Sequence, residues 1–321
     1  MRYLRTLLVL GRVSNLPTVW TNCLVGMVVA GGGLAAVCDG SSWMALFIPE
    51  KPGGEAWGVF PAWSFTMGCV MLGVSLLYVG GMYLNDYADV KWDREHAPER
   101  PIPSGAISEN AVLYLAVLWM GGGGLVLYGS DLWEGAGSSV VWVGVLFFAI
   151  VAYDFLHKKW VGSVGLMGLC RFAVYPVAAT AVLGGGNVVP VLPPALWWVA
   201  AGMFFYVVGV TLAAKGERSG GVVKRVAWVC LLVPVVVWVW LGVTGLGVLV
   251  LVVMAWWWWR TAGHLRVKAD KNRVGGFVSG LLAGIVVVDA LMVSAVDARA
   301  AWICLAMLPV CLVLQRKVPA T

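Results

Sequence analysis

The chain is organised around one charged stretch, Asn85-Asp86-Tyr87-Ala88-Asp89-Val90-Lys91-Trp92-Asp93-Arg94. It follows directly after a long apolar run, residues 62–84, and no other part of the sequence gathers as many carboxylates. An apolar run of that length is sufficient to cross a bilayer, and charged residues avoid the hydrocarbon. The pattern therefore predicts that the carboxylates lie at the mouth of a membrane-embedded bundle, over an apolar pocket.

The composition excludes a water-soluble globular domain. The chain has 321 residues, of which 61% are hydrophobic and 12% are charged, and its mean hydropathy is +0.88. Soluble domains carry about 25% charged residues. We therefore expect an all-α polytopic membrane protein with a single membrane-embedded domain, residues 1–321. The net charge of +6 does not indicate a nucleic-acid partner, because the basic residues lie in short segments between apolar runs.

The apolar segments predict nine to ten membrane-spanning helices, since a span needs about 20 apolar residues. The candidates are 16–36, 62–84, 108–128, 139–156, 164–185, 195–214, 226–242, 246–259, 274–293 and 300–314. The seventh and eighth form either a tight hairpin or one broken element, and the last two could be one kinked helix. Residues 1–12 predict an interfacial helix.

The distribution of positive charge predicts the orientation in the membrane. With the N-terminus in the cytoplasm, nineteen of the 22 Lys and Arg residues fall on the cytoplasmic side. Cytoplasmic segments carry this excess of Lys and Arg in membrane proteins. We therefore expect an integral protein of the cell inner membrane, with its N-terminus and the charged loops, including 85–107, in the cytoplasm.

The three aspartates of the opening stretch predict a magnesium site. Offsets of three and seven place Asp86, Asp89 and Asp93 within about 60° of one helical face. Like charges so close repel, and Mg²⁺ removes that cost by binding carboxylates together with phosphate oxygens. Arg94 and Arg100 can neutralise a phosphate further. The alternative interpretation is a solvated cytoplasmic loop with charges of both signs.

The pattern Asn85-Asp86-x-x-Asp89-x-x-x-Asp93, followed by Arg100-Pro-Ile-Pro-Ser-Gly105, resembles the first aspartate-rich motif of the UbiA superfamily of intramembrane prenyltransferases. Two further stretches agree. Residues 12–18, Arg-Val-Ser-Asn-Leu-Pro-Thr, resemble the opening of the family before its first helix, and residues 153–158, Tyr-Asp-Phe-Leu-His-Lys, resemble its tyrosine-to-lysine signature. The resemblance runs from about residue 8 to at least residue 220.

The resemblance implies a function. An isoprenyl diphosphate would bind with its head at two aspartate-rich loops and its tail in the bundle, and the prenyl group would pass to a lipophilic or aromatic acceptor within the membrane lipid. Asp86, Asp89 and Asp93 would hold Mg²⁺, with Asn85 supporting them. The substrate-binding residues implied by the motifs are Asn15, Arg94, Arg100, Tyr153 and Lys158.

The second loop departs from the family pattern. Residues 211–221, Thr-Leu-Ala-Ala-Lys-Gly-Glu-Arg-Ser-Gly-Gly, hold one carboxylate, Glu217, between Lys215 and Arg218. We expect these three residues to contact the diphosphate, with the two basic side chains replacing a second metal. The loop resembles the divergent EboC-like branch of the superfamily. It leaves open two alternatives, a UbiA-like terpene cyclase and a non-catalytic carrier or transporter of a phosphorylated lipid.

Two charged residues, Arg171 and Asp289, lie well inside predicted spans, away from both ends. Arg171 lies seven residues into its span, roughly 10 Å deep at 1.5 Å per residue, and intramembrane charges usually face the interior. This position predicts that Arg171 contacts the diphosphate or the acceptor. The alternative is that its side chain snorkels to the membrane surface. Asp289 lies much deeper, so we expect only a polar contact between helices and no direct pair with Arg171. Of the polar residues in the first span, the motif selects Asn15 over Thr18 and Asn22 as the pocket residue.

Overall fold

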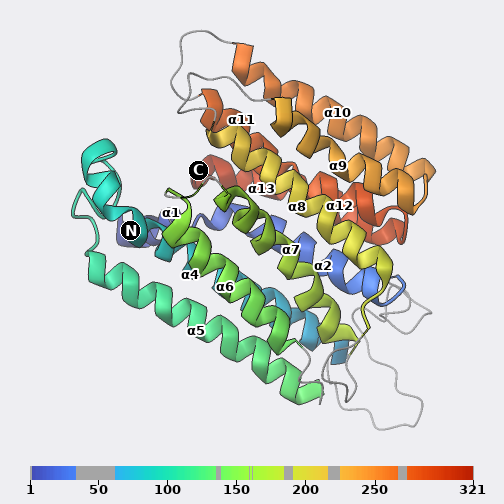
Figure 1. The fold of residues 1–321 in the computed structure, drawn as a ribbon, viewed down its shortest axis with the longest axis horizontal. Helices are drawn as coiled ribbons and strands as arrows, with labels where there is room; N and C mark the ends of the chain where they lie inside the picture. Colours follow the sequence, from blue (N-terminus) through green and yellow to red (C-terminus); the bar gives the residue numbers. More distant parts are fainter. Residues whose placement is uncertain are drawn as a thin grey trace.

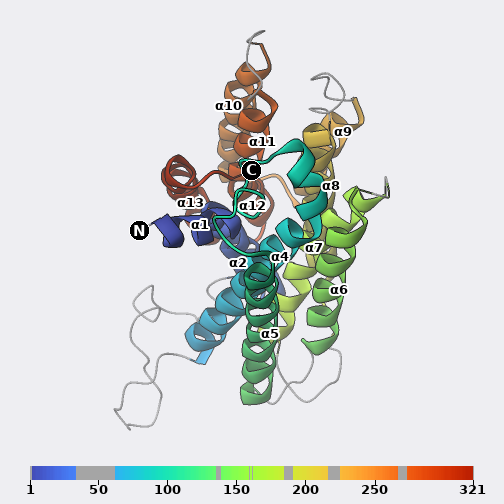
Figure 2. The same cartoon turned by 90° about the vertical axis from the view of Figure 1, so that its left-hand side faces the viewer.

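The computed structural model describes residues 2–33, 62–134, 139–158, 160, 162–183, 191–215, 225–266 and 273–320. Every regular element in these residues is helical (Figures 1 and 2), so the all-α prediction is confirmed. The elements are α1 (Arg2–Leu10), η1 (Val13–Asn15), α2 (Leu16–Ala30), α4 (Ala62–His96), α5 (Glu109–Glu134), α6 (Val140–Leu156), α7 (Ser163–Val182), α8 (Pro194–Lys215), α9 (Arg225–Leu241), α10 (Gly245–Arg266), α11 (Arg273–Ala283), α12 (Ile285–Val293) and α13 (Ala298–Lys317).

The number of apolar helices agrees with the predicted number of spans. In the described part of the chain, eight helical segments are long and apolar enough to cross a membrane, and α6 and α9 are two shorter apolar helices. Each of the shorter helices has 17 residues, about 25 Å at 1.5 Å per residue, which a slightly thinned bilayer accommodates. The chain is therefore an integral membrane protein.

The structure also shows how the closely spaced apolar segments of the C-terminal half are divided into helices. Residues 242–244 separate α9 from α10, so the seventh and eighth segments are two helices. α12 and α13 are separated by residues 294–297 and pack against each other, so they form a hairpin and not one kinked helix. Within the ninth segment the helix breaks at Gly284, which divides it into α11 and α12.

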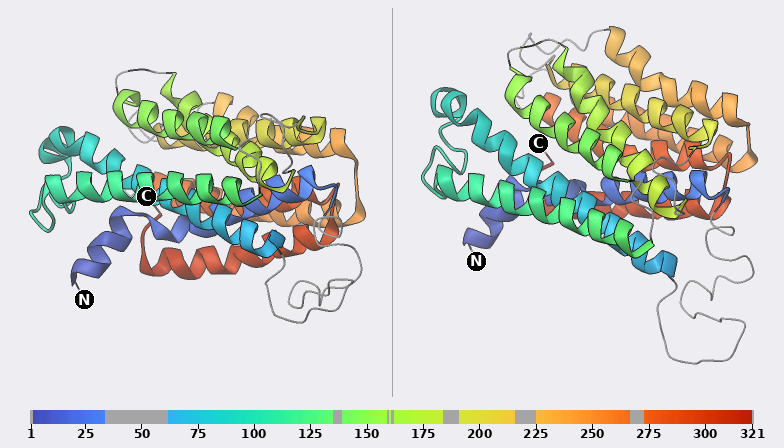
Figure 3. Two further views of the ribbon diagram at one scale, coloured as in Figure 1. Left: turned by 90° about the horizontal axis from the view of Figure 1, so that it is seen from below. Right: turned by 60° about the horizontal axis from the view of Figure 1, so that its bottom comes forward.

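The helices run back and forth, so that N-terminus and C-terminus lie toward the same end of the bundle (Figures 1 and 3). The basic residues in the last turns of helices gather at this end: Arg94 of α4, Lys215 of α8, and Arg316 and Lys317 of α13. The end that carries the positive charge therefore also carries the aspartate-rich motif.

Helix α4 carries this motif beyond the membrane. Its 35 residues span about 52 Å at 1.5 Å per residue, against about 30 Å of hydrocarbon. The sequence has neither Gly nor Pro from Met82 to His96, and the helix ends just before Ala97-Pro98, where proline disfavours the helical conformation of the residue before it. The expectation of a loop from residue 85 is therefore wrong for 85–96. The aspartates are fixed on a rigid helix.

Glycines allow α4 and α5 to pack closely. A Cβ atom added at Gly123 would lie 2.7 Å from the carbonyl oxygen of Gly73, and one added at Gly80 would lie 2.8 Å from the backbone nitrogen of Met120. Backbone atoms cannot move aside as the end of a side chain can. Small residues at helix crossings are the usual means of close packing in membranes.

Gly123→Ala is expected to destabilise the protein by about 1–3 kcal/mol, the usual cost of overpacking. The matched control is Gly124→Ala, since a Cβ atom at Gly124 has no neighbour within 4 Å. Alanine favours a helix over glycine by up to about 1 kcal/mol, so this control should be neutral or stabilising. Thermal unfolding of both variants in detergent tests the contrast, and equal stabilities would contradict the close crossing.

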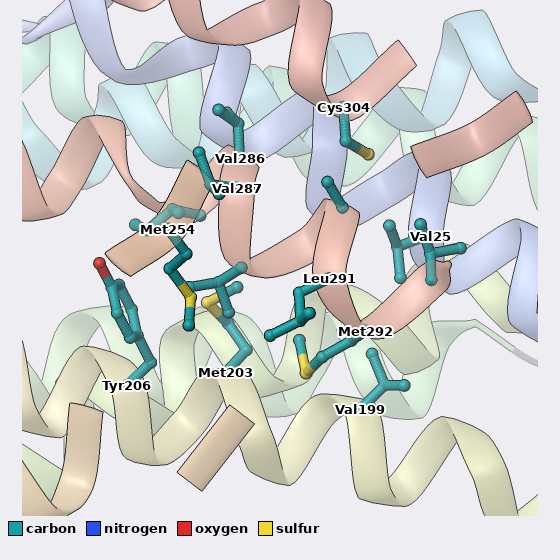
Figure 4. Close-up of a cluster of buried hydrophobic side chains, with 14 of the residues drawn as sticks. Val25, Val199, Met203, Tyr206, Met254, Val286, Val287, Leu291, Met292 and Cys304 are labelled. Carbon is teal, nitrogen blue, oxygen red and sulfur yellow. The ribbon is translucent and has the colours of Figure 1, made fainter. Parts of the chain in front are cut away.

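The centre of the C-terminal half is α12, all nine of whose residues are buried. Figure 4 shows its side chains facing residues from α2, α8 and α10: Val25, Val199, Met203 and Met254. At the break before α12, Trp257 Nε1 donates to the carbonyl of Gly280 at 2.8 Å and the Tyr206 hydroxyl to that of Leu281 at 2.9 Å. Partners of this kind permit a break in a membrane helix. The packing fixes α12, and with it Asp289, at the core.

Candidate functional site

A central cavity of about 570 Å³ lies among the helices. Its apolar lining comes from both halves of the bundle: Val19, Val74, Leu77, Leu146, Ile150, Met167, Val174, Val207, Val210, Val278, Leu282 and Ile285. Its charged and hydrogen-bonding lining includes Arg12, Asn15, Tyr78, Trp92, Arg100, Tyr153, Asp154, His157, Arg171 and Thr211. The cavity thus combines an apolar interior with polar groups from the end of the bundle that bears the aspartates.

Asp86 and Asp93 share one arginine. Arg100 Nη1 lies 2.9 Å from Asp93 Oδ2 and 3.9 Å from Asp86 Oδ1, and Arg12 Nη2 approaches the same Asp86 oxygen at 3.5 Å. The Asp93 side chain is only 2% exposed, yet its Oδ1 atom is buried with no hydrogen-bond partner. Two of the three aspartates therefore converge on one cationic position.

Asp89 faces a different partner, the C-terminal end of α6. Its Oδ1 lies 2.6 Å from Lys158 Nζ and 3.3 Å from His157 Nε2, and Lys158 stands over the Trp92 ring at 4.4 Å. Although the three aspartates share one face of α4, Asp89 pairs with the residues that follow α6 and the other two pair with Arg100. Across the described residues, no group of three or more His, Cys, Asp or Glu side chains is arranged to hold a metal ion.

Asp154 is a fourth acidic residue that sequence reasoning missed. Its Oδ1 accepts a hydrogen bond from Asn85 Nδ2 at 3.1 Å, and its Oδ2 is buried without a partner. The residue is 3% exposed and lines the central cavity. The available signal was an acid inside a predicted apolar span, directly after Tyr153.

Arg12 is a second residue that the sequence did not single out, although it lies in a recognised stretch. It adopts φ 43° in the turn between α1 and η1, which carries its side chain to Asp86 and to the cavity. Burial by itself lowers the pKa of the Arg12 guanidinium, but Asp86, Tyr78, Tyr153 and Asp154 together raise it by more, so the pKa lies above its ordinary value. Arg12 is therefore a permanent cation at the cavity mouth.

A second polar cluster, the deep network, joins Arg171 to Asp289. Arg171 Nη1 donates to Asn22 Oδ1 at 2.9 Å and its Nη2 to Thr18 Oγ1 at 3.0 Å. Asn22 Nδ2 donates to Asp289 Oδ2 at 2.8 Å, and the Tyr175 hydroxyl donates to Asp289 Oδ1 at 2.5 Å. Asp289 thus has more than a simple contact between two helices. It is linked to Arg171 through Asn22.

The remaining predicted residues lie in different surroundings. Asn15 lines the cavity and donates to the Tyr78 hydroxyl at 3.2 Å, and Tyr153 lines it and stacks on His157. Arg94 is exposed, pairs with Glu109 at 2.9 Å and does not line the cavity. Lys215 Nζ donates to Ser163 Oγ at 3.3 Å. Glu217 and Arg218 lie outside the described residues.

Known proteins match much of this chain. Residues 55–281 match the model of the UbiA prenyltransferase family. The chain is 43% identical over 115 residues to a digeranylgeranylglyceryl phosphate synthase of Pyrococcus furiosus, covering 30% of this chain and 42% of that protein. It is 48% identical over 52 residues to the synthase of the same name from Pyrococcus abyssi, covering 16% and 19% respectively. The matched regions thus span less than half the length of these relatives.

Structural comparison extends the match in fold over nearly the whole chain. A solved structure described as "Structural and mechanistic insights into the biosynthesis of Digeranylgeranylglyceryl phosphate synthase in membranes" superposes with a TM-score of 0.55 and 16% identity. The superposition covers 92% of this chain and 99% of that one. The helix bundle, the motif on α4 and the match over residues 55–281 agree with one another. The chain belongs to the UbiA prenyltransferase family.

Proposed function

We propose that this protein transfers a prenyl group from an isoprenyl diphosphate to a lipophilic or aromatic acceptor in the membrane. The observation that supports this most strongly is the central cavity of about 570 Å³, whose interior is apolar and whose lining includes Arg12 and Arg100, both paired with carboxylates of α4. An isoprenyl diphosphate matches this cavity, because it joins an apolar chain to a charged diphosphate head. The prenyl tail would lie in the cavity and the diphosphate at its mouth.

The basic side chains at the mouth would bind the diphosphate. Arg12, Arg100 and Lys158 all pair with carboxylates, at 3.5, 2.9 and 2.6 Å respectively. Charge-assisted hydrogen bonds to phosphate oxygens are strong, and fixed cations favour the departure of an anionic leaving group. Lys215 at the end of α8, and Glu217 and Arg218, which lie outside the described residues, stay predictions for the same role.

The donor set at the mouth fits Mg²⁺. Asp86 and Asp93 offer carboxylate oxygens, the ligands that Mg²⁺ prefers, and Asp93 Oδ1 is buried without a partner. We propose that these two hold the ion, while Asp89 pairs separately with Lys158 and Asn85 donates a hydrogen bond to Asp154. Mg²⁺ bound there would offset the negative charge of the diphosphate and stabilise it as a leaving group.

The cavity would protect the allylic cation left after diphosphate departs. Its lining is largely apolar, which would disfavour water that could trap the cation. Tyr78, Trp92 and Tyr153 place aromatic rings along the wall, and aromatic faces stabilise a cation. Arg171 also lines the cavity, so the reacting carbon would lie away from its guanidinium.

The relatives suggest which substrates to test first. Their name, digeranylgeranylglyceryl phosphate synthase, refers to geranylgeranyl groups and to a glyceryl phosphate. Geranylgeranyl diphosphate is therefore the first donor and a prenylated glyceryl phosphate the first acceptor to test, with farnesyl diphosphate and an aromatic acceptor as comparisons.

The test is the release of diphosphate by the purified protein with Mg²⁺ and labelled donor. Acceptor-dependent release, with label appearing in the acceptor, is expected for the transferase. Release without any acceptor, with a cyclised hydrocarbon product, would indicate the cyclase. Tight donor binding without release for either donor would indicate a carrier and would refute the enzyme.

We also propose that the charged end of the bundle faces the cytoplasm across the inner membrane. The basic residues at the ends of α4, α8 and α13 support this orientation. A cysteine in place of the exposed Glu99 should react with an impermeant maleimide in inside-out vesicles only. Labelling in right-side-out vesicles alone would reverse the orientation.

A further inference from the structure

We propose that Asp154 is the catalytic base that removes the proton from the acceptor. The inference rests on the proposed function, because a proton must leave the acceptor only if a prenyl group is transferred to an O–H or C–H position. Asp154 comes from the C-terminal end of α6, is 3% exposed and lines the central cavity. Its Oδ2 atom is buried without a hydrogen-bond partner, although an unsatisfied buried acceptor is costly. A proton brought by a substrate would satisfy it.

The other acidic residues of the site are less suited to this role. Each aspartate of the motif on α4 has a basic side chain within 4.0 Å, so accepting a proton would mean giving up an ion pair. Asp154 forms no ion pair within the described ranges. Those ranges contain one carboxylate among the residues that line the cavity, and it is Asp154.

Asp289 is also unsuited to act as the catalytic base, for a different reason. One of its oxygens accepts from Asn22 and the other from Tyr175, and the residue does not line the cavity. Both of its acceptor atoms are therefore occupied, and an acceptor substrate in the cavity would not reach them.

Asn85 acts as the positioning residue for the base. Its amide Nδ2 donates to Asp154 Oδ1 at 3.1 Å, which holds the carboxylate through a neutral group. A neutral amide orients the carboxylate without cancelling its negative charge. An arginine in the same place would form an ion pair and make the carboxylate a weaker base. This arrangement leaves Oδ2 as the free basic atom, held in one direction.

The step balances without any further reactant. An electron pair on the acceptor oxygen, or on an aromatic carbon, forms the bond to C1 of the prenyl group. The bond between C1 and the diphosphate oxygen breaks, and its electron pair leaves with the diphosphate. The proton of the acceptor passes to Asp154 Oδ2, and the neutral carboxyl group returns it to water after the product leaves. The site therefore calls for an acceptor that carries a hydroxyl or an electron-rich aromatic ring.

Asp154→Asn is the first variant, because it keeps the shape of the side chain and removes the base. General bases contribute about 10²–10⁴-fold to rates, so single-turnover transfer should fall at least about 100-fold. Binding of geranylgeranyl thiodiphosphate with Mg²⁺ should stay within about threefold of wild type, since binding involves no proton transfer. Asp154→Glu, which restores a carboxylate, should recover part of the transfer rate. An aromatic acceptor whose hydroxyl ionises below neutral pH should be prenylated by Asp154→Asn at nearly the wild-type rate.

The matched control is Asp297→Asn, the same substitution at the N-cap of α13, where Asp297 Oδ1 accepts from the backbone of Ala300. Asparagine caps a helix as well as aspartate, so this variant should behave as wild type. Loss of thiodiphosphate binding in Asp154→Asn would overturn the assignment, because Asp154 would then belong to the diphosphate site. Unchanged transfer in that variant would overturn it as well. Absence of transfer by the wild-type chain would instead refute the proposed function, and the base with it.

Discussion

Asp86→Asn is expected to lower prenyl transfer at least about 100-fold and to abolish the Mg²⁺ dependence of donor binding. The asparagine keeps the size of the side chain but loses the negative charge. Asp86 then no longer balances Arg12 at 3.5 Å or Arg100 at 3.9 Å, and it no longer offers a charged ligand to a metal. Equilibrium binding of labelled geranylgeranyl diphosphate with and without Mg²⁺, followed by single-turnover transfer, measures both effects.

The control is Glu95→Gln on the same helix. The Glu95 side chain is 77% exposed and lies beside the motif without lining the cavity, so this variant should bind and react as wild type. Wild-type affinity in Asp86→Asn would show that the aspartates are only the solvated end of α4. Equal losses in both variants would show a general effect of surface charge.

Asp289→Leu is expected to be the most destabilising single change, by about 3–5 kcal/mol. Leucine removes the acceptor of both Asn22 and Tyr175, which are fully buried, and takes away the carboxylate linked to Arg171. A buried cation whose compensating charge is removed is strongly unfavourable. Thermal unfolding in detergent, followed by aggregation or by tryptophan fluorescence, gives the size of the loss.

A double variant separates coupling from simple loss of packing. Asp289→Leu combined with Arg171→Met removes both charges, and the pair should be less destabilised than the two single effects added together. Strict additivity would show that Arg171 and Asp289 do not communicate through Asn22.

The helices and the motif could be predicted because both depend on local sequence. Apolar runs of sufficient length determine the spans, and the absence of Gly and Pro before Pro98 keeps α4 helical through Asp93. The loop assigned to residues 85–96 was wrong because a charged stretch was equated with a loop, although charged residues extend a helix readily outside the hydrocarbon.

The partners of the aspartates could not be predicted, because they depend on tertiary packing. Asp89 and Asp93 lie four residues apart on one helix, yet one meets Lys158 of the segment after α6 and the other meets Arg100. Helical spacing gives the direction of each side chain but not the identity of the neighbour. Asp154 was overlooked for the same reason, since Asn85 lies 69 residues away in sequence.

The deep network joins residues that lie far apart in the sequence. Asn22 and Asp289 are 267 residues apart, and depth along separate spans predicted only that Arg171 and Asp289 form no direct pair. The estimate of depth ignored the reach of Asn22, which donates to one and accepts from the other. Pairwise depth along straight helices cannot reveal a connection through a third residue.

The most direct test of the proposed function is to locate the bound prenyl chain within the protein. A geranylgeranyl diphosphate analogue with a photoreactive group on its tail, bound with Mg²⁺ and irradiated, should label α4 and α7 near Leu77 and Val174, which line the central cavity. The protein offers a clear alternative in an outer apolar groove of about 420 Å³ between α5 and α6, lined by Tyr128, Phe147 and Phe148. Labelling of Leu77 and Val174 that unlabelled donor competes away is the result we predict. Labelling confined to the outer groove, or unaffected by competition, would contradict the account.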